Sequence, residues 1–174
     1  MSDRFPAMAR NATVLVIDPS PGDRAQICEC LNQLPDLRII AVGEAEHALQ
    51  AIREANPSLV LLDIALPDVN GLEVLKQIKR LRPNLPVLIF SMFSEDEFAI
   101  PSLEAGASGF LNKDSPPNQI LTAIRTVVGG ARYLSPTLAE KLLAGVAPTG
   151  RKLAHETLSR REAEVLLMLS KGTS

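Results

Sequence analysis

The sequence has no tryptophan, a single tyrosine and only two cysteines. Cys28 and Cys30 stand two apart in a predicted helix and point in different directions, so we expect no disulfide and a reducing setting. His47 and His155 lie far apart and have no cysteine at ligand spacing, which predicts no zinc site. Long apolar segments are also missing, and residues 1–11 contain no apolar signal-peptide core. We therefore expect a cytoplasmic protein with no membrane partner.

An excess of charge of one sign is missing as well. The chain carries 18 basic and 20 acidic residues, for a formal net charge of −2, so any nucleic-acid contact needs a local basic patch. The 174 residues are 46% hydrophobic and 22% charged, which is typical of a globular chain that buries a core. This length predicts one domain, or one domain with an appendage.

Short apolar, β-branched segments alternate with helical patterns. Strands are predicted at residues 14–17, 37–42, 59–62, 86–90 and 109–111, and helices at 45–55 and 117–128 and in segments ending near 34, 81 and 105. Apolar strands separated by helices are typical of an α/β fold with a parallel sheet covered on both faces. Five such units suit a doubly wound sheet, since a barrel needs eight.

The pattern changes after Gly130. Residues 135–143 form a predicted connecting helix with a serine N-cap and a proline at its first position, and residues 144–156 lack periodicity. A second amphipathic helix follows at 158–170, with Ser159 and Glu162 as a capping box. One helix cannot bury its own apolar face, so this segment begins another domain. The predicted division is a flexible tail (1–12), a domain (13–130), a connecting helix and linker (131–156) and an incomplete second domain (157–174).

Functional groups follow four of the predicted strands: Asp18, Asp63, Ser91 and Lys113. If the strand order is 2-1-3-4-5, the two aspartates converge where the winding reverses, which is where such sheets bind ligands. Two carboxylates suit Mg²⁺, and a hydroxyl with an ammonium suits a phosphoryl group. Each residue alone is more typical of an ordinary strand end. The combination predicts phosphoryl transfer to an aspartate.

Four segments resemble the receiver domain of two-component response regulators: residues 14–21, 59–73 (LVLLDIALPDVNGLE), 86–92 (PVLIFSM) and 106–115 (GASGFLNKDS). Residues 140–174, above all LSRREAEVLLMLSKGTS, resemble the start of a LuxR-type helix-turn-helix, which points to the NarL/FixJ type. The resemblance implies a flavodoxin-like receiver with strand order 2-1-3-4-5, followed by a helical linker and a partial helix-turn-helix.

The resemblance also implies residue roles. Asp63 would accept a phosphoryl group from a sensor histidine kinase, and Asp18, Asp63 and the backbone carbonyl of Ala65 would hold Mg²⁺. Receivers of this kind usually carry two adjacent acidic residues after the first strand, and the second normally touches the metal. Pro19 stands at that place here. Weakened Mg²⁺ binding is therefore expected, and the alternative is a pseudo-receiver that acts as a phosphorylation-independent interaction or dimerisation module.

Activation involves three further positions in such receivers. Ser91 would move to hydrogen-bond the phosphoryl group, and Lys113 would pair with its charge. Phe110 would change rotamer together with Ser91, unless it is an ordinary core aromatic. Pro101 falls within a helical pattern in a region that signals in this family. Because proline lacks the N–H for a bond to Glu97, we expect a helix that begins near Pro101 or a kink there.

Two enzyme or cofactor classes fit less well. A haloacid dehalogenase needs an acid/base aspartate two residues after its nucleophile, where this chain has Ala65. A flavodoxin binds its flavin phosphate after the first strand, where residues 18–23 carry carboxylates instead. We therefore expect a signalling protein and not an enzyme. DNA binding is expected only through the complete output domain of a longer parent chain, because the recognition helix would lie beyond residue 174. A homodimer is a further possible partner state.

Overall fold

Five parallel strands form the centre of the computed structural model, which describes residues 11–145. Along the sheet they run β2-β1-β3-β4-β5, which confirms the predicted order. The strands are β1 (Ala12–Ile17), β2 (Leu37–Val42), β3 (Leu59–Leu62), β4 (Val87–Ser91) and β5 (Gly109–Asn112). The winding reverses between β1 and β3, and the register there pairs Ile17 with Leu62. The next residue of each strand, Asp18 or Asp63, thus lies at the same edge.

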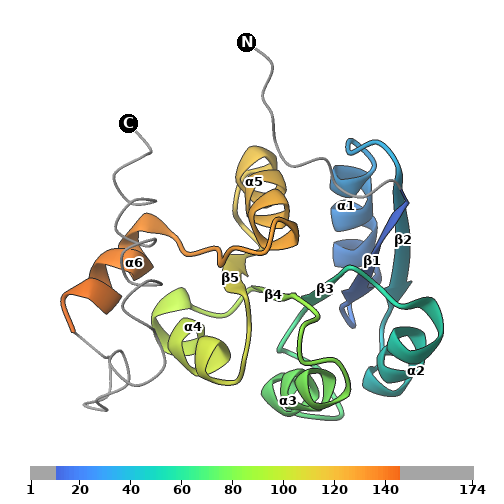
Figure 1. Ribbon diagram of the computed structural model, residues 1–174, viewed down its shortest axis with the longest axis horizontal. Helices are drawn as coiled ribbons and strands as arrows, with labels where there is room; N and C mark the ends of the chain where they lie inside the picture. Colours follow the sequence, from blue (N-terminus) through green and yellow to red (C-terminus); the bar gives the residue numbers. More distant parts are fainter. Residues whose placement is uncertain (1–10, 146–174) are drawn as a thin grey trace.

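Helices cover both faces of the sheet (Figure 1). One face carries α1 (Pro21–Leu31) and α5 (Pro117–Val128), and the other carries α2 (Ala45–Ala55), α3 (Gly71–Leu81) and α4 (Glu95–Glu104). Successive strand residues point to opposite faces, so Val14 and Val16 pack with the α1–α5 layer while Leu15 and Ile17 pack with the other. All four side chains are at most 1% exposed, which explains why the strands are apolar without alternation.

A sixth helix, α6 (Pro136–Leu143), lies beside α4 (Figure 1). Ser135 caps it by accepting a hydrogen bond from the Leu138 amide at 3.1 Å, and its hydroxyl also donates to Glu95 Oε1 at 2.5 Å. Leu138 is 2% exposed and belongs to the core on the α2–α4 side. The helix predicted as a connector is therefore packed against the sheet domain. No helix within residues 11–145 is long and apolar enough to span a membrane.

Most element boundaries agree with the predictions to within one or two residues, and two helix boundaries differ by more. The α4 helix begins at Glu95, so a helix that begins near Pro101 is wrong. Three acidic residues fill its first turn, where the helix dipole favours them, and Pro101 lies inside. The α1 helix ends at Leu31 and not at Leu34, because the chain turns at Asn32. Residues 1–10 and 146–174, which include most of the predicted tail and linker and the whole start of the second domain, lie outside the described residues.

Candidate functional site

Two aspartates lie side by side at the carboxyl edge of the sheet. The Asp18 amide donates to Val42 O at 3.0 Å, and the Asp63 amide donates to Ile17 O at 2.8 Å. These bonds continue the sheet pairing by one residue and fix both carboxylates in position. Asp18 is 1% exposed and Asp63 is 5% exposed. Two carboxylates this well buried need a cation beside them.

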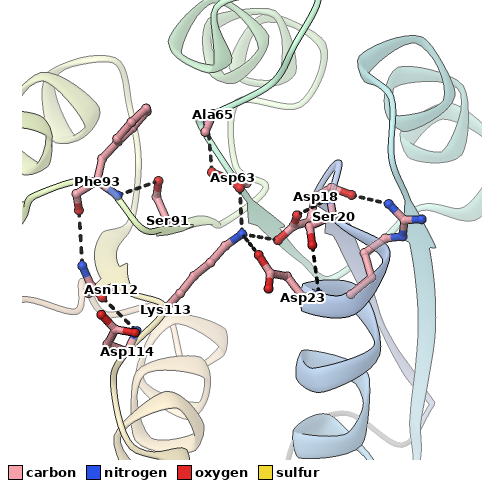
Figure 2. A network of polar contacts seen from close by, with 11 residues as sticks. Asp18, Ser20, Asp23, Asp63, Ala65, Ser91, Phe93, Asn112, Lys113 and Asp114 are labelled. Carbon is pink, nitrogen blue, oxygen red and sulfur yellow. Dashed lines mark hydrogen bonds and ion pairs between the residues drawn. The ribbon is translucent and has the colours of Figure 1, made fainter.

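Lys113 supplies that cation from the end of β5. Its backbone amide donates to Ser91 O at 3.0 Å, which extends the pairing of β5 with β4. Its side chain crosses the edge of the sheet (Figure 2), and Nζ lies 2.6 Å from Asp18 Oδ2 and 2.8 Å from Asp63 Oδ2. Three of the residues selected from the sequence thus share one contact point.

A third carboxylate joins them. Asp23 Oδ2 lies 2.7 Å from Lys113 Nζ, and the Asp23 side chain is 38% exposed. Reasoning from strand ends missed this residue as a site member, because it belongs to the first turn of α1. The signal was in the sequence: Ser20 as N-cap and Pro21 at the first position place Asp23 in a turn that opens at the carboxyl edge of β1.

The electrostatics favour a charged Lys113. Burial of its ammonium opposes the charged form, but the close contacts with the carboxylates of Asp18, Asp23 and Asp63 outweigh this and raise the Lys113 pKa above its ordinary value. Asp18 Oδ2 is in ion-pair distance of Nζ without hydrogen-bond geometry, and within residues 11–145 it has no hydrogen-bond partner. Three carboxylates and one ammonium give the cluster a formal charge of minus two.

The cluster is not arranged as a metal site in its present form. Among residues 11–145, no three Asp, Glu, His or Cys side chains are already grouped as metal ligands. Lys113 Nζ lies among the three carboxylates in the place of a cation. The donors themselves fit Mg²⁺, since they are carboxylate oxygens with an unbalanced charge of minus two.

The remaining predicted residues are Ala65, which contacts Asp63 directly, and Ser91 and Phe110 of the two neighbouring strands β4 and β5. The Ala65 amide donates to Asp63 Oδ1 at 2.9 Å, which orients that carboxylate. Ser91 is fully buried at the end of β4, and its Oγ accepts from the Phe93 amide at 3.3 Å (Figure 2). Its hydroxyl is therefore engaged with the β4–α4 loop. Phe110 is also fully buried and packs in the core on the α2–α4 side, where it pairs with Ile89 of β4 and lies three residues before Lys113.

Chemically, the arrangement offers an oriented carboxylate, a fixed ammonium and a nearby hydroxyl. Asp63 is held through both oxygens, one by the Ala65 amide and the other by Lys113. A carboxylate of this kind can act as a nucleophile toward phosphorus, while the ammonium attracts the phosphoryl charge. No proton acceptor is needed, because the nucleophile is already an anion.

The sequence matches the response regulator receiver domain over residues 14–125. It is 37% identical to the transcriptional activator protein ExaE of Pseudomonas putida, over 92% of this chain and 76% of that protein. It is 33% identical to the nitrate/nitrite response regulator protein NarL of Escherichia coli K12, with the same two coverages.

A solved structure is similar as well. A LuxR-family two-component response regulator from Aurantimonas sp. SI85-9A1 superimposes with a TM-score of 0.71 and 30% sequence identity. The match covers 77% of this chain and 96% of that one. Sequence and fold therefore agree on one family.

Proposed function

The chain belongs to the receiver-containing response regulators of two-component signalling, and on that premise we propose that it accepts a phosphoryl group on Asp63 from a sensor histidine kinase. The observation that carries the proposal is the convergence of Asp18, Asp63 and Lys113 at the point where the sheet reverses its winding. Ligands bind at this place in doubly wound sheets.

In the proposed transfer, an Asp63 carboxylate oxygen attacks the phosphorus of a phosphohistidine. The O–P bond forms as the P–N bond breaks, and the electron pair of that bond stays on the histidine nitrogen of the kinase. The carboxylate becomes an acyl phosphate with about two negative charges. Lys113 is already within 2.8 Å of Asp63 Oδ2, so its ammonium is in reach of the new charge.

Mg²⁺ is the cofactor that the donor set suits. Asp18, Asp63 and the backbone carbonyl of Ala65 would hold it. When bound, the metal would neutralise the charge that develops on the transferring oxygens. The carboxylate oxygens present and the formal charge of minus two of the whole cluster support this assignment.

Ser91 would transmit the phosphorylation of Asp63 to the β4–α4 loop. Its hydroxyl accepts a hydrogen bond from the Phe93 amide and keeps its own proton to donate to a phosphoryl oxygen; a shift of Ser91 toward that oxygen would weaken one of the two hydrogen bonds at the Phe93 backbone. The Phe93 ring stacks on Phe98 of α4 with centroids 4.7 Å apart. The buried Phe110 would follow Ser91 by changing rotamer. The proposed output is transcription, through DNA binding by a complete helix-turn-helix domain.

The proposal is tested by intact-mass measurement after incubation with acetyl phosphate, with and without Mg²⁺. We expect one phosphoryl adduct that requires Mg²⁺ and that is lost in Asp63→Asn. The Asp114→Asn variant is the matched control, since Asp114 is exposed and makes no contact with the cluster in the described contacts. An adduct that persists in Asp63→Asn would refute the assignment of the acceptor.

A second candidate function rests on Pro19, which provides no side-chain oxygen where an acidic ligand is usual. In this case the chain is a pseudo-receiver and acts through protein contacts alone. A folded wild-type protein that takes no phosphoryl group at any Mg²⁺ concentration would favour this function. A dimer that forms equally with and without acetyl phosphate, measured by light scattering, would support it further.

A further inference from the structure

We propose that Asp23 is a divalent-cation ligand of this site and supplies the carboxylate that Pro19 cannot. The role in phosphoryl transfer rests on the proposed function, whereas cation binding itself does not. Three observations support this role: the contact of the Asp23 carboxylate with Lys113, the capping of α1 without that carboxylate, and the net negative charge of the cluster.

The carboxylate of Asp23 points into the cluster and not to solvent alone. Its Oδ2 lies 2.7 Å from Lys113 Nζ, and the same nitrogen contacts Asp18 and Asp63 (Figure 2). Three carboxylates from the end of β1, the first turn of α1 and the end of β3 thus already share one cation. An ion that replaced the ammonium at this point would meet all three.

The start of α1 leaves Asp23 free for this role. An acidic residue three places after a serine N-cap usually bonds back to the N-cap amide. Here the Ser20 amide donates to Asp18 Oδ1 at 2.8 Å instead, while the Asp23 amide donates to Ser20 Oγ at 3.3 Å. The helix is therefore capped without the Asp23 carboxylate, and its backbone is tied to Asp18 through Ser20.

The net negative charge of the cluster favours the binding of a divalent cation. Its formal charge is minus two, and Asp18 Oδ2 is buried without a hydrogen-bond partner in the part of the chain that the structure describes. Asp18 and Asp63 are nearly inaccessible, whereas Asp23 is 38% exposed. Asp23 is thus the carboxylate that an ion arriving from solvent meets first. The ion must displace Lys113 Nζ from Asp23 and Asp18, so cation and ammonium compete.

The test compares Mg²⁺ binding to the full chain by titration calorimetry in wild type, Asp23→Asn and the matched control Asp114→Asn. The Asp23→Asn variant keeps the size and removes the charge, and we expect at least about tenfold weaker binding, since even indirect metal partners cost that much. The control changes the same charge at an exposed site beside Lys113, and we expect a change of less than about twofold.

A second readout separates direct ligation from general loss of charge. Mn²⁺ added to isotope-labelled protein should broaden the amide signals of residues 18, 23 and 63 in wild type, and only at higher Mn²⁺ in Asp23→Asn. The rescue variant Pro19→Asp/Asp23→Asn should regain most of the Mg²⁺ affinity. In the wild-type background, Pro19→Asp should increase the Mg²⁺ affinity less than it does in the Asp23→Asn background. The reason is that Asp23 already supplies this carboxylate in the wild-type protein.

Two outcomes overturn the proposal: Asp23→Asn binds Mg²⁺ as tightly as wild type, or wild type binds no divalent cation. A loss in Asp23→Asn that Pro19→Asp does not rescue also counts against it. Failure of the proposed function is distinguishable. If wild type binds Mg²⁺ through Asp23 but acetyl phosphate leaves no adduct on Asp63, the assignment of Asp23 as a cation ligand is retained. The proposal that Asp63 accepts a phosphoryl group is then refuted.

Discussion

Replacing Lys113 with methionine should destabilise the protein strongly and make its stability depend on Mg²⁺. Methionine keeps the apolar length of the side chain and removes only the ammonium. The Lys113 side chain is 7% exposed, and its contacts Asp18 and Asp63 are 1% and 5% exposed. Removal of one partner from a buried ion pair costs about 3–5 kcal/mol, because the remaining charges are left without compensation. Asp23 adds little to this figure, because water screens its 38% exposed side chain.

The matched control is Lys76→Met. Lys76 Nζ also lies 2.7 Å from a carboxylate, that of Glu73, but the two side chains are 47% and 51% exposed. Such surface pairs contribute about 0–1 kcal/mol, so the same substitution should change the free energy of unfolding little. Urea unfolding followed by far-UV circular dichroism measures both variants, since the chain has no tryptophan for fluorescence.

Mg²⁺ and pH extend the test. Mg²⁺ at about 100 times its Kd should return about 2.7 kcal/mol to Lys113→Met, since the folded state alone binds it. In wild type the raised Lys113 pKa keeps its contribution complete below roughly pH 10.4, and the contribution is lost only as the pH rises through the folded value. A Lys113→Met variant as stable as wild type without Mg²⁺ would refute this reasoning.

Three further variants or measurements test the fold around the site. Gly71→Ala should lose about 1–3 kcal/mol of unfolding free energy, because the new Cβ would clash with the backbone of Ile64. Ile64 directly follows Asp63, so the same variant should slow the phosphorylation of Asp63; urea unfolding and intact mass measure the two effects. Leu138→Ala should lose about 2–5 kcal/mol in urea unfolding, since Leu138 is 2% exposed; a change below about 1 kcal/mol would mean that α6 is not part of the core. Burial raises the pKa of the Cys28 and Cys30 thiols, so both should alkylate slowly at pH 7.5, and Cys30, which is 8% exposed, should be the slower in a mass-spectrometric time course.

The sheet and its edge residues follow from sequence because their signals are local. Continuous apolar segments predict buried parallel strands, and the reversal between the first and third strands brings Asp18 and Asp63 together without knowledge of any contact. Lys113 joins them because parallel strands all end at the same edge. The position of Asp23 in the site was not predicted, because it depends on where α1 begins and on which hydrogen bonds cap this helix.

The start of α4 did not follow from sequence, because tertiary contacts decide it. Proline in a helix costs one backbone hydrogen bond, and this argued for a start near Pro101. The first turn of α4 is held from outside, by Ser135 on Glu95 and by Lys141 on Asp96, both from the α6 segment. Contacts between segments about 40 residues apart are invisible to local propensity, which tertiary context overrides.

The same ammonium serves two opposed needs of this site. In the metal-free protein, Lys113 neutralises carboxylates that would otherwise repel one another, so the fold does not depend on a bound ion. That contact also competes with Mg²⁺, because both cations use the oxygens of Asp18 and Asp23. An added carboxylate at residue 23 strengthens both competitors, but a divalent ion gains about twice as much Coulomb energy from it as an ammonium at equal distance. Asp23 therefore shifts the competition toward the metal, which is the direction that a site with Pro19 requires.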